Sequence, residues 1–187
     1  MSWRLIETMQ VAPQPWRNGQ GRTRELLAWP DAADWRVRVS VADIEADAPF
    51  SSFPGVERWL VVLKGAGVAL DIDGTPHRQT RIDPPLCFDG ATTVHCRLID
   101  GPTQDLNLML RGLRGGMQVA EDGAPWRPDG TACGLYTAVA GRCTADGETT
   151  AVPAYALLWF ESAPRSLSFR AGGRPAGAIG WWLEVQS

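Results

Sequence analysis

The chain has 187 residues, a formal net charge of −3 at neutral pH and 21% charged residues. This composition lacks the excess of positive charge typical of proteins that bind nucleic acids or membrane surfaces, so neither partner is expected. A hydrophobic content of 44%, with nine tryptophans, is sufficient for a packed core in one domain or in two closely packed halves.

The first residues show no targeting segment. Residues 1–11 contain no apolar run of the length found in a signal peptide, and no stretch is long and apolar enough to cross a bilayer. The four cysteines, Cys87, Cys96, Cys133 and Cys143, form no CxxC pair. The sequence therefore predicts a cytoplasmic protein with reduced, mainly structural thiols.

Short runs rich in β-branched and aromatic residues alternate with Gly and Pro turn signals along the whole chain. No amphipathic pattern of helical period extends beyond about three turns. The runs predicted as strands are Trp35–Ala42, Trp59–Leu63, Val68–Ile72, Val94–Ile99, Asp105–Arg111, Gly134–Ala140, Tyr155–Phe160, Ser166–Arg170 and Ala178–Val185. Short, evenly spaced strands of this kind favour an all-β sandwich or barrel.

The segment from Gly112 to Gly130 interrupts this pattern. It is polar and irregular, and it contains the Gly115-Gly116 pair and two prolines. We expect a linker here, dividing the chain into an N-terminal half, residues 1–112, and a C-terminal half, residues 113–187. The three motif segments described below all lie in the first half, which is therefore the favoured place for a site.

Two of the predicted strands alternate strictly between two faces. In the first, valines 37, 39 and 41 share one face, and the other carries Arg36, Arg38 and Ser40. In the second, leucines 106, 108 and 110 share one face, and the other carries Asp105, Asn107, Met109 and Arg111. Periodicity leaves two alternatives open: the polar faces are solvated, or they line a barrel interior that binds a ligand.

Three segments together indicate a family. They read P-W-R-N-G-Q-G-R-T-R-E-L at residues 15–26, F-S-S-F-P-G-V-E-R-W-L at 50–60 and D-L-N-L-M-L-R at 105–111. In order and spacing they resemble the HutD/Ves family, over nearly the whole chain. One departure is that family members carry an aromatic residue directly before the arginine equivalent to Arg38, whereas here the aromatic residue is Trp35.

The resemblance carries expectations about fold and role. It implies a double cupin, that is, two small antiparallel β-barrels or sandwiches in one chain, often paired as a homodimer. It also implies an association with histidine utilisation. The role proposed for the family is regulation or sensing, with formylglutamate or a related small carboxylate as the ligand; fold likeness by itself does not establish this role.

Metal-dependent cupins bind their ion through an HxH pair, a glutamate and a later histidine. This sequence has two histidines, His77 and His95, which are far apart and form no HxH. No metal and no other cofactor is therefore expected. The sequence also lacks a G-x-S-x-G motif and a cysteine with a recognisable histidine partner, so no catalytic residue is predicted.

The polar residues of the motif segments predict a binding site for a carboxylate. Arginine side chains can bind a carboxylate through two parallel hydrogen bonds, while serine and asparagine can fix an amide or formyl group. A carboxylate can orient an arginine or accept a hydrogen bond from a ligand N–H. The predicted ligand-binding residues are Arg24, Glu25, Arg38, Ser40, Arg58, Asp105, Asn107 and Arg111. Surface ion pairs, strand-end charges and turn caps are the structural alternatives for these residues.

Three functions remain open at this stage. The first is a metal-independent binding protein that senses or regulates histidine breakdown. The second is a metal-free enzyme acting on a small polar metabolite, with Glu25 or Asp105 as the base. The third is an interaction protein whose barrel is filled by side chains and whose strand edges and tryptophans form a dimer.

Overall fold

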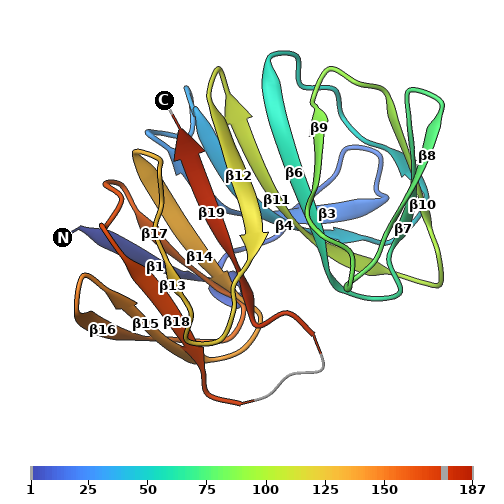
Figure 1. Ribbon diagram of the computed structural model, residues 1–187. Helices are drawn as coiled ribbons and strands as arrows, with labels where there is room; N and C mark the ends of the chain where they lie inside the picture. Colours follow the sequence, from blue (N-terminus) through green and yellow to red (C-terminus); the bar gives the residue numbers. More distant parts are fainter. Residues whose placement is uncertain (1, 174–176, 187) are drawn as a thin grey trace. The chain divides into compact units, whose positions relative to one another are not determined.

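The computed structural model describes residues 2–173 and 177–186. Within this part, the regular elements are strands, with one short 3-10 turn at Thr8–Gln10 (Figure 1). The expectation of an all-β double cupin is confirmed. No helix in the described ranges has the length and apolar character needed to cross a membrane.

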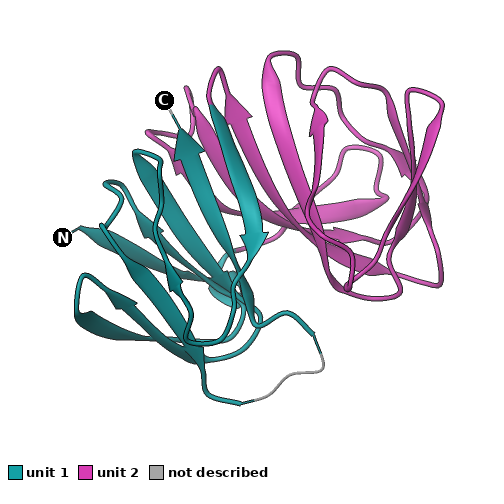
Figure 2. Ribbon diagram, viewed as in Figure 1, with its two compact units in different colours: residues 1–11, 114–187 teal, residues 12–113 magenta. Residues whose placement is uncertain are grey.

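The chain divides into two compact units, coloured separately in Figure 2: residues 12–113, and residues 1–11 together with 114–187. The first contains a six-stranded sheet made, in spatial order, of β2 (Gln14–Pro15), β3 (Gly21–Trp29), β4 (Val37–Ile44), β11 (Thr103–Arg111), β6 (Val56–Lys64) and β9 (Leu86–Asp89). Its four-stranded sheet is made of β5 (Ala48–Pro49), β10 (Val94–Leu98), β7 (Val68–Ile72) and β8 (Thr75–Gln79).

The core of the unit formed by residues 12–113 follows from the side-chain alternation of its strands. A cluster of buried apolar residues joins the two sheets and consists of Ile44, Leu60, Val68, Leu70, Phe88, Val94 and Cys96. On the opposite face of the large sheet, the valines of β4 and the leucines of β11 are also buried. Because β4, β11 and β6 are buried on both faces, their pocket-facing polar residues are held on a rigid support.

The other unit has the same two-sheet arrangement. Its five-stranded sheet is made of β1 (Trp3–Glu7), β17 (Ala156–Phe160), β14 (Ala132–Thr137), β19 (Gly180–Gln186) and β12 (Arg114–Val119). Its four-stranded sheet is made of β13 (Pro125–Trp126), β18 (Leu167–Ala171), β15 (Gly141–Ala145) and β16 (Glu148–Val152). Its core is packed with large side chains, among them Trp182 stacked on Trp126 with ring centroids 4.8 Å apart.

The division between the units differs from the expected halves at the N-terminus. The sequence placed residues 1–11 in the first half, whereas the structure groups them with residues 114–187. The cause is β1, which pairs antiparallel with β17 from Trp3 opposite Phe160 to Glu7 opposite Ala156. The N-terminal strand therefore completes a sheet built from the C-terminal part of the chain.

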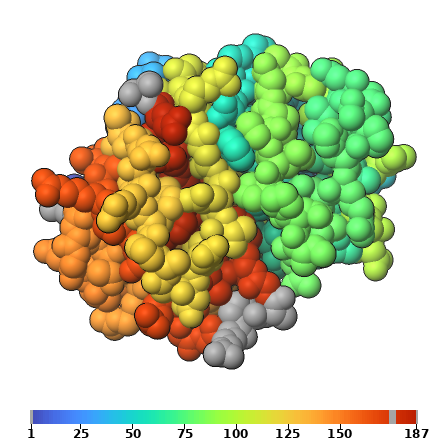
Figure 3. All heavy atoms as spheres, in the orientation of Figure 1, coloured from blue at the N-terminus to red at the C-terminus, as the bar shows by residue number. Residues whose placement is uncertain are grey.

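The segment expected to be a linker contains two strands instead. Residues 114–119 form β12 and residues 125–126 form β13. β12 lies at the edge of its sheet, where Gly115 and Gly116 are tolerated more readily than in a central strand. Parts of this segment, yellow in Figure 3, lie at the surface, where Gln118 and Val119 are exposed.

Two glycines in neighbouring turns provide a test of local packing. Gly67 and Gly74 both have a positive φ, at 106° and 81°. A Cβ added to Gly67 would lie 2.3 Å from the carbonyl oxygen of Gln79, whereas one added to Gly74 would meet no atom of the described residues within 4 Å. Gly74→Ala should therefore lower the free energy of unfolding by about 1–2 kcal/mol through backbone strain alone. Gly67→Ala should cost more, because β8 must also move.

Urea denaturation of both variants beside the wild type measures this difference. Equal losses of stability in the two variants would show that the close approach of the backbone at Gly67 does not constrain the fold.

Candidate functional site

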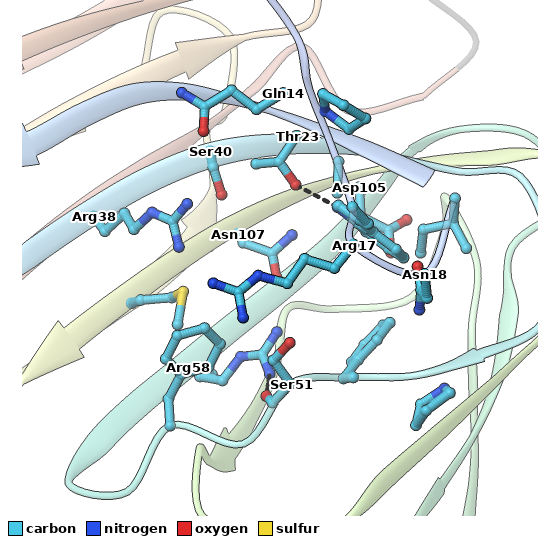
Figure 4. A pocket seen from close by; sticks show the side chains of 18 residues that line it. Gln14, Arg17, Asn18, Thr23, Arg38, Ser40, Ser51, Arg58, Asp105 and Asn107 are labelled. Atoms are coloured by element: carbon cyan, nitrogen blue, oxygen red, sulfur yellow. Dashed lines mark hydrogen bonds between the residues drawn. The ribbon is translucent and has the colours of Figure 1, made fainter. Parts of the chain in front are cut away.

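A cavity of about 400 Å³ lies within the unit of residues 12–113 (Figure 4), a volume typical of small-molecule sites. The large sheet supplies one wall, and the loops around residues 15–18 and 49–53 supply the rest. The lining residues are Gln14, Pro15, Trp16, Arg17, Asn18, Thr23, Arg38, Ser40, Ala42, Ile44, Pro49, Phe50, Ser51, Phe53, Arg58, Asp105, Asn107 and Met109.

The polar faces of the two alternating strands meet at this cavity. Arg38 and Ser40 of β4 and Asp105 and Asn107 of β11 all line it. The side chains of Ser40, Asp105 and Asn107 are buried. Periodicity left open whether these faces are solvated or line a barrel interior. The four residues line the interior. Arg36, at the start of the same alternation, is exposed.

The strand register orders the side chains on the cavity side of the sheet in rows across β4, β11 and β6. From one end, the rows are Arg38–Met109–Arg58, Ser40–Asn107–Leu60 and Ala42–Asp105–Val62. The two arginines thus start from the same row, whereas Asp105 lies two rows away. Four residues of β11 separate these rows, which corresponds to about 13 Å at 3.3 Å per residue. The cavity therefore has a cationic end and an end that carries a carboxyl group.

Three guanidinium groups gather at the cationic end. Figure 4 shows the side chain of Arg17 extending from the loop after β2 toward the space between Arg38 and Arg58. The Nε of Arg38 donates to Oε2 of Glu25 at 2.6 Å. Of these three arginines, only Arg38 has a carboxylate oxygen within 4.0 Å among the described residues. The cluster therefore carries an excess of positive charge that an anion would neutralise.

Arg58 is the most deeply buried of the three. Its guanidinium lies 5.0–5.6 Å from the ring centroids of Phe50, Phe53 and Phe88. Its Nη1 donates to the backbone oxygen of Ser51 at 3.2 Å, and its Nε has no hydrogen-bond partner among the described residues. Burial, followed by the positive charge of Arg38, lowers the pKa of Arg58 to about 10. The aromatic rings hold this cation in place but leave part of its hydrogen-bonding capacity for a ligand.

Asp105 is completely buried at the other end. Both of its carboxyl oxygens lack a hydrogen-bond partner among the described residues, although the residue lines the cavity. Burial raises the pKa of Asp105 to about 8. At neutral pH the carboxyl is therefore mostly protonated and neutral. Buried polar groups are normally paired, so an unpaired one on a cavity wall marks a position where a ligand or water forms the missing bond.

Three of the predicted site residues do not line the cavity. Arg24 is paired with Val41 across β3 and β4, and so belongs to the sheet face opposite Arg38; its Nη1 donates to Asp43 at 2.6 Å. Arg111 lies beyond the row of Arg58, and its guanidinium covers the ring of Trp35 at 4.0 Å. Glu25 binds Arg38 and therefore acts by positioning that side chain.

Several lining residues were not predicted from the sequence, and Arg17 is the most important of them. Arg17 stands in the P-W-R-N-G segment that carries the family resemblance, which is the signal that could have found it. No strand alternation marks this loop. Its position is fixed by Trp16, whose Nε1 donates to Oγ1 of Thr23 at 2.8 Å, the bond dashed in Figure 4.

The residues of the cavity do not fit the metal site of a metal-dependent cupin. His77 and His95 belong to β8 and β10 of the smaller sheet and do not line the cavity. The described ranges contain no group of three or more His, Cys, Asp or Glu side chains placed to hold a metal ion. Three guanidinium groups at one end would in addition repel a cation, so the donor set is suited to an anion.

The paired two-sheet units and the polar cavity in one of them define the chain as a double cupin. The family model named HutD matches residues 8–176, and the chain belongs to the HutD family. It is 35% identical over 156 residues to protein Ves of Citrobacter koseri, a match that covers 72% of this chain and 79% of the relative.

A second relative is a 21.2 kDa protein encoded in the region 3′ of hutC in Pseudomonas putida. It is 36% identical over 109 residues. The match covers 56% of each chain, so this chain spans little more than half the length of that relative.

Solved structures show the same fold. A conserved protein of Pseudomonas aeruginosa PAO1 superposes with a TM-score of 0.87 at 26% identity, covering 100% of both chains. HutD of Pseudomonas fluorescens SBW25 gives a TM-score of 0.83 at 23% identity, covering 99% of this chain and 98% of that one. Salicylate 1,2-dioxygenase of Pseudoaminobacter salicylatoxidans gives 0.65 at 9% identity over 97% and 81% of the chains, a likeness of fold alone.

The buried carboxyl predicts a specific dependence of stability on pH. The pKa of Asp105 is about 8 in the folded protein, against about 3.9 for an aspartate in an unfolded chain. Between these values the folded state keeps a proton that the unfolded state releases, so this group lowers stability progressively as the pH rises from 4 to 8. Asp105→Asn removes the effect and should stabilise the protein at pH 8 by about 1–3 kcal/mol.

Thermal denaturation of both proteins at pH 5, 6.5 and 8 checks this. The advantage of the variant should increase with pH. A difference in Tm that stays constant across the three pH values would contradict the assignment of a buried, protonated carboxyl.

Proposed function

We propose that the protein is a metal-independent binding protein for a small carboxylate metabolite such as formylglutamate, with a sensing or regulatory role in histidine utilisation. The observation that carries the proposal is the convergence of Arg17, Arg38 and Arg58 on one cavity, where only Arg38 has a carboxylate partner among the described residues. An anion is the ligand class that such a cluster binds most favourably.

The energetics of Arg58 support an anionic ligand. A guanidinium that is 7% exposed and has no ion pair in the described ranges has lost much of its hydration without gaining a counter-charge. An incoming carboxylate would supply that charge and the partner that Nε lacks. Ser40 and Asn107, in the next row, are placed to bond an amide or formyl group of the same molecule.

The relatives support the metabolic setting. One is encoded beside hutC in Pseudomonas putida, and a structural neighbour is the HutD protein of Pseudomonas fluorescens. Formylglutamate combines two carboxylates with a formamide group, which suits a cavity with both guanidinium and amide donors. The cytoplasm, where such a metabolite would be met, is part of this proposal, and so is a homodimer, which light scattering tests directly.

A calorimetric titration with formylglutamate, glutamate, urocanate and histidine in parallel tests the ligand. Saturable heat is expected with formylglutamate. Arg58→Ala and Arg17→Ala should each weaken its binding by about 1.5–3 kcal/mol, because each removes a charged hydrogen bond. Arg17 is exposed, so its removal leaves the fold intact even if Arg58→Ala destabilises the aromatic cluster.

Arg97→Ala is the matched control. Arg97 is an exposed arginine on β10 of the same unit and does not line the cavity, so its loss should leave the affinity unchanged. If none of the four compounds produces heat, the proposal is wrong, and an interaction function would be favoured in its place.

A further inference from the structure

We infer that Asp105 forms a second binding subsite, a neutral carboxyl that donates a hydrogen bond to an acceptor oxygen at the far end of a carboxylate ligand. This inference rests on the proposed function and specifies the ligand class more narrowly. The cavity then selects elongated molecules that carry an anionic group at one end and a hydrogen-bond acceptor at the other. The sequence had suggested the reverse role for Asp105, as acceptor of a ligand N–H.

The position of Asp105 provides the first argument. Its side chain is 0% exposed and lines the cavity, and neither carboxyl oxygen has a hydrogen-bond partner in the described part of the chain. Leaving such a group unpaired is unfavourable, and a hydrogen bond to a ligand would recover that cost. Asn107, the next residue on the same face of β11, lies between Asp105 and the row that contains Arg38 and Arg58.

The charges around Asp105 provide the second argument. Arg38 and Arg58 start two rows away, and no arginine lies within ion-pair distance of Asp105 among the described residues. Burial, followed by the negative charges of Asp105 and Asp47, raises the pKa of the Cys96 thiol on β10 to about 12. No cation in the described ranges therefore compensates an ionised Asp105, and burial favours the neutral form.

The chemistry of the ligand follows from the neutral state. A carboxylic acid has one O–H donor, whereas a carboxylate can only accept. An ionised Asp105 would repel a second carboxylate or a carbonyl oxygen of an anionic ligand, but the protonated group can bind either. Diacids and N-acylated acidic amino acids have the required acceptor at a distance from the first carboxylate. Malonate, with its two carboxylates close together, occupies the arginine end alone.

The first experiment compares diacids of increasing length. Malonate, succinate, glutarate and adipate are titrated into the wild type, Asp105→Asn and Asp105→Leu. Asp105→Asn keeps a neutral donor of nearly the same shape and should bind each diacid within about threefold of the wild type at pH 7. Asp105→Leu should leave the affinity for malonate unchanged. It should weaken binding of the longest diacid that the wild type binds tightly by about tenfold, because one hydrogen bond to a charged group is lost.

The second experiment varies the pH from 6.5 to 9 with the same diacid. In the wild type, binding should weaken about tenfold between pH 7 and 9, as Asp105 ionises with its pKa of about 8. The Asp105→Asn profile should be flat. The pKa of Arg58, about 10, and that of Cys96, about 12, lie above this range, so neither group accounts for such a change.

The outcomes separate this inference from the proposal beneath it. If no diacid and no formylglutamate binds the wild type, both fail. If diacids bind and the arginine variants weaken them, but Asp105→Leu behaves as the wild type or weakens malonate equally, the subsite is wrong and the anion site stands. A loss of binding in Asp105→Asn as large as in Asp105→Leu would show that a neutral hydrogen-bond donor at this position does not hold the ligand, which also overturns the inference.

Discussion

The site depends on the alternation of side chains along β4, β11 and β6, three adjacent strands of one sheet. On one face, the valines and leucines of β4 and β11 are buried. On the other, the same backbone presents Arg38, Asn107 and Arg58 to a cavity. A register shift of one residue would exchange the two faces, so burial of the apolar face fixes the polar one. The binding geometry is therefore a consequence of the packing that stabilises the sheet.

Much of the fold was predictable because these strands carry clear period-2 patterns and turn signals. Val68–Ile72 has the predicted bounds, and β11 extends the predicted strand by two residues. β12 was missed because its glycines are typical of turns, and an edge strand requires little side-chain packing. β3 was missed because its polar run was interpreted as a motif, without attention to its alternation.

The candidate site was predictable only in part, for similar reasons. Alternation placed Arg38, Ser40, Asp105 and Asn107 on common faces, but could not distinguish solvent from a cavity. Arg24 was included because it stands in a motif segment, although the pairing of β3 with β4 turns it to the other face. Arg17 lies in a loop, where only tertiary structure determines which side chain reaches the cavity. Burial, which sets the protonation of Asp105, is likewise absent from a sequence pattern.

The pairing of β1 with β17, a strand far along the chain, affects the order in which the protein can fold during synthesis at the ribosome. Residues 12–113 form a continuous unit that can complete its contacts as soon as it emerges, whereas Trp3 pairs with Phe160. β1 must therefore remain unpaired until β17 has been made. Closing so long a loop costs only slightly more entropy than closing a short one, but it is slow. A chain that terminates before β17 therefore leaves β1 as an unprotected strand edge.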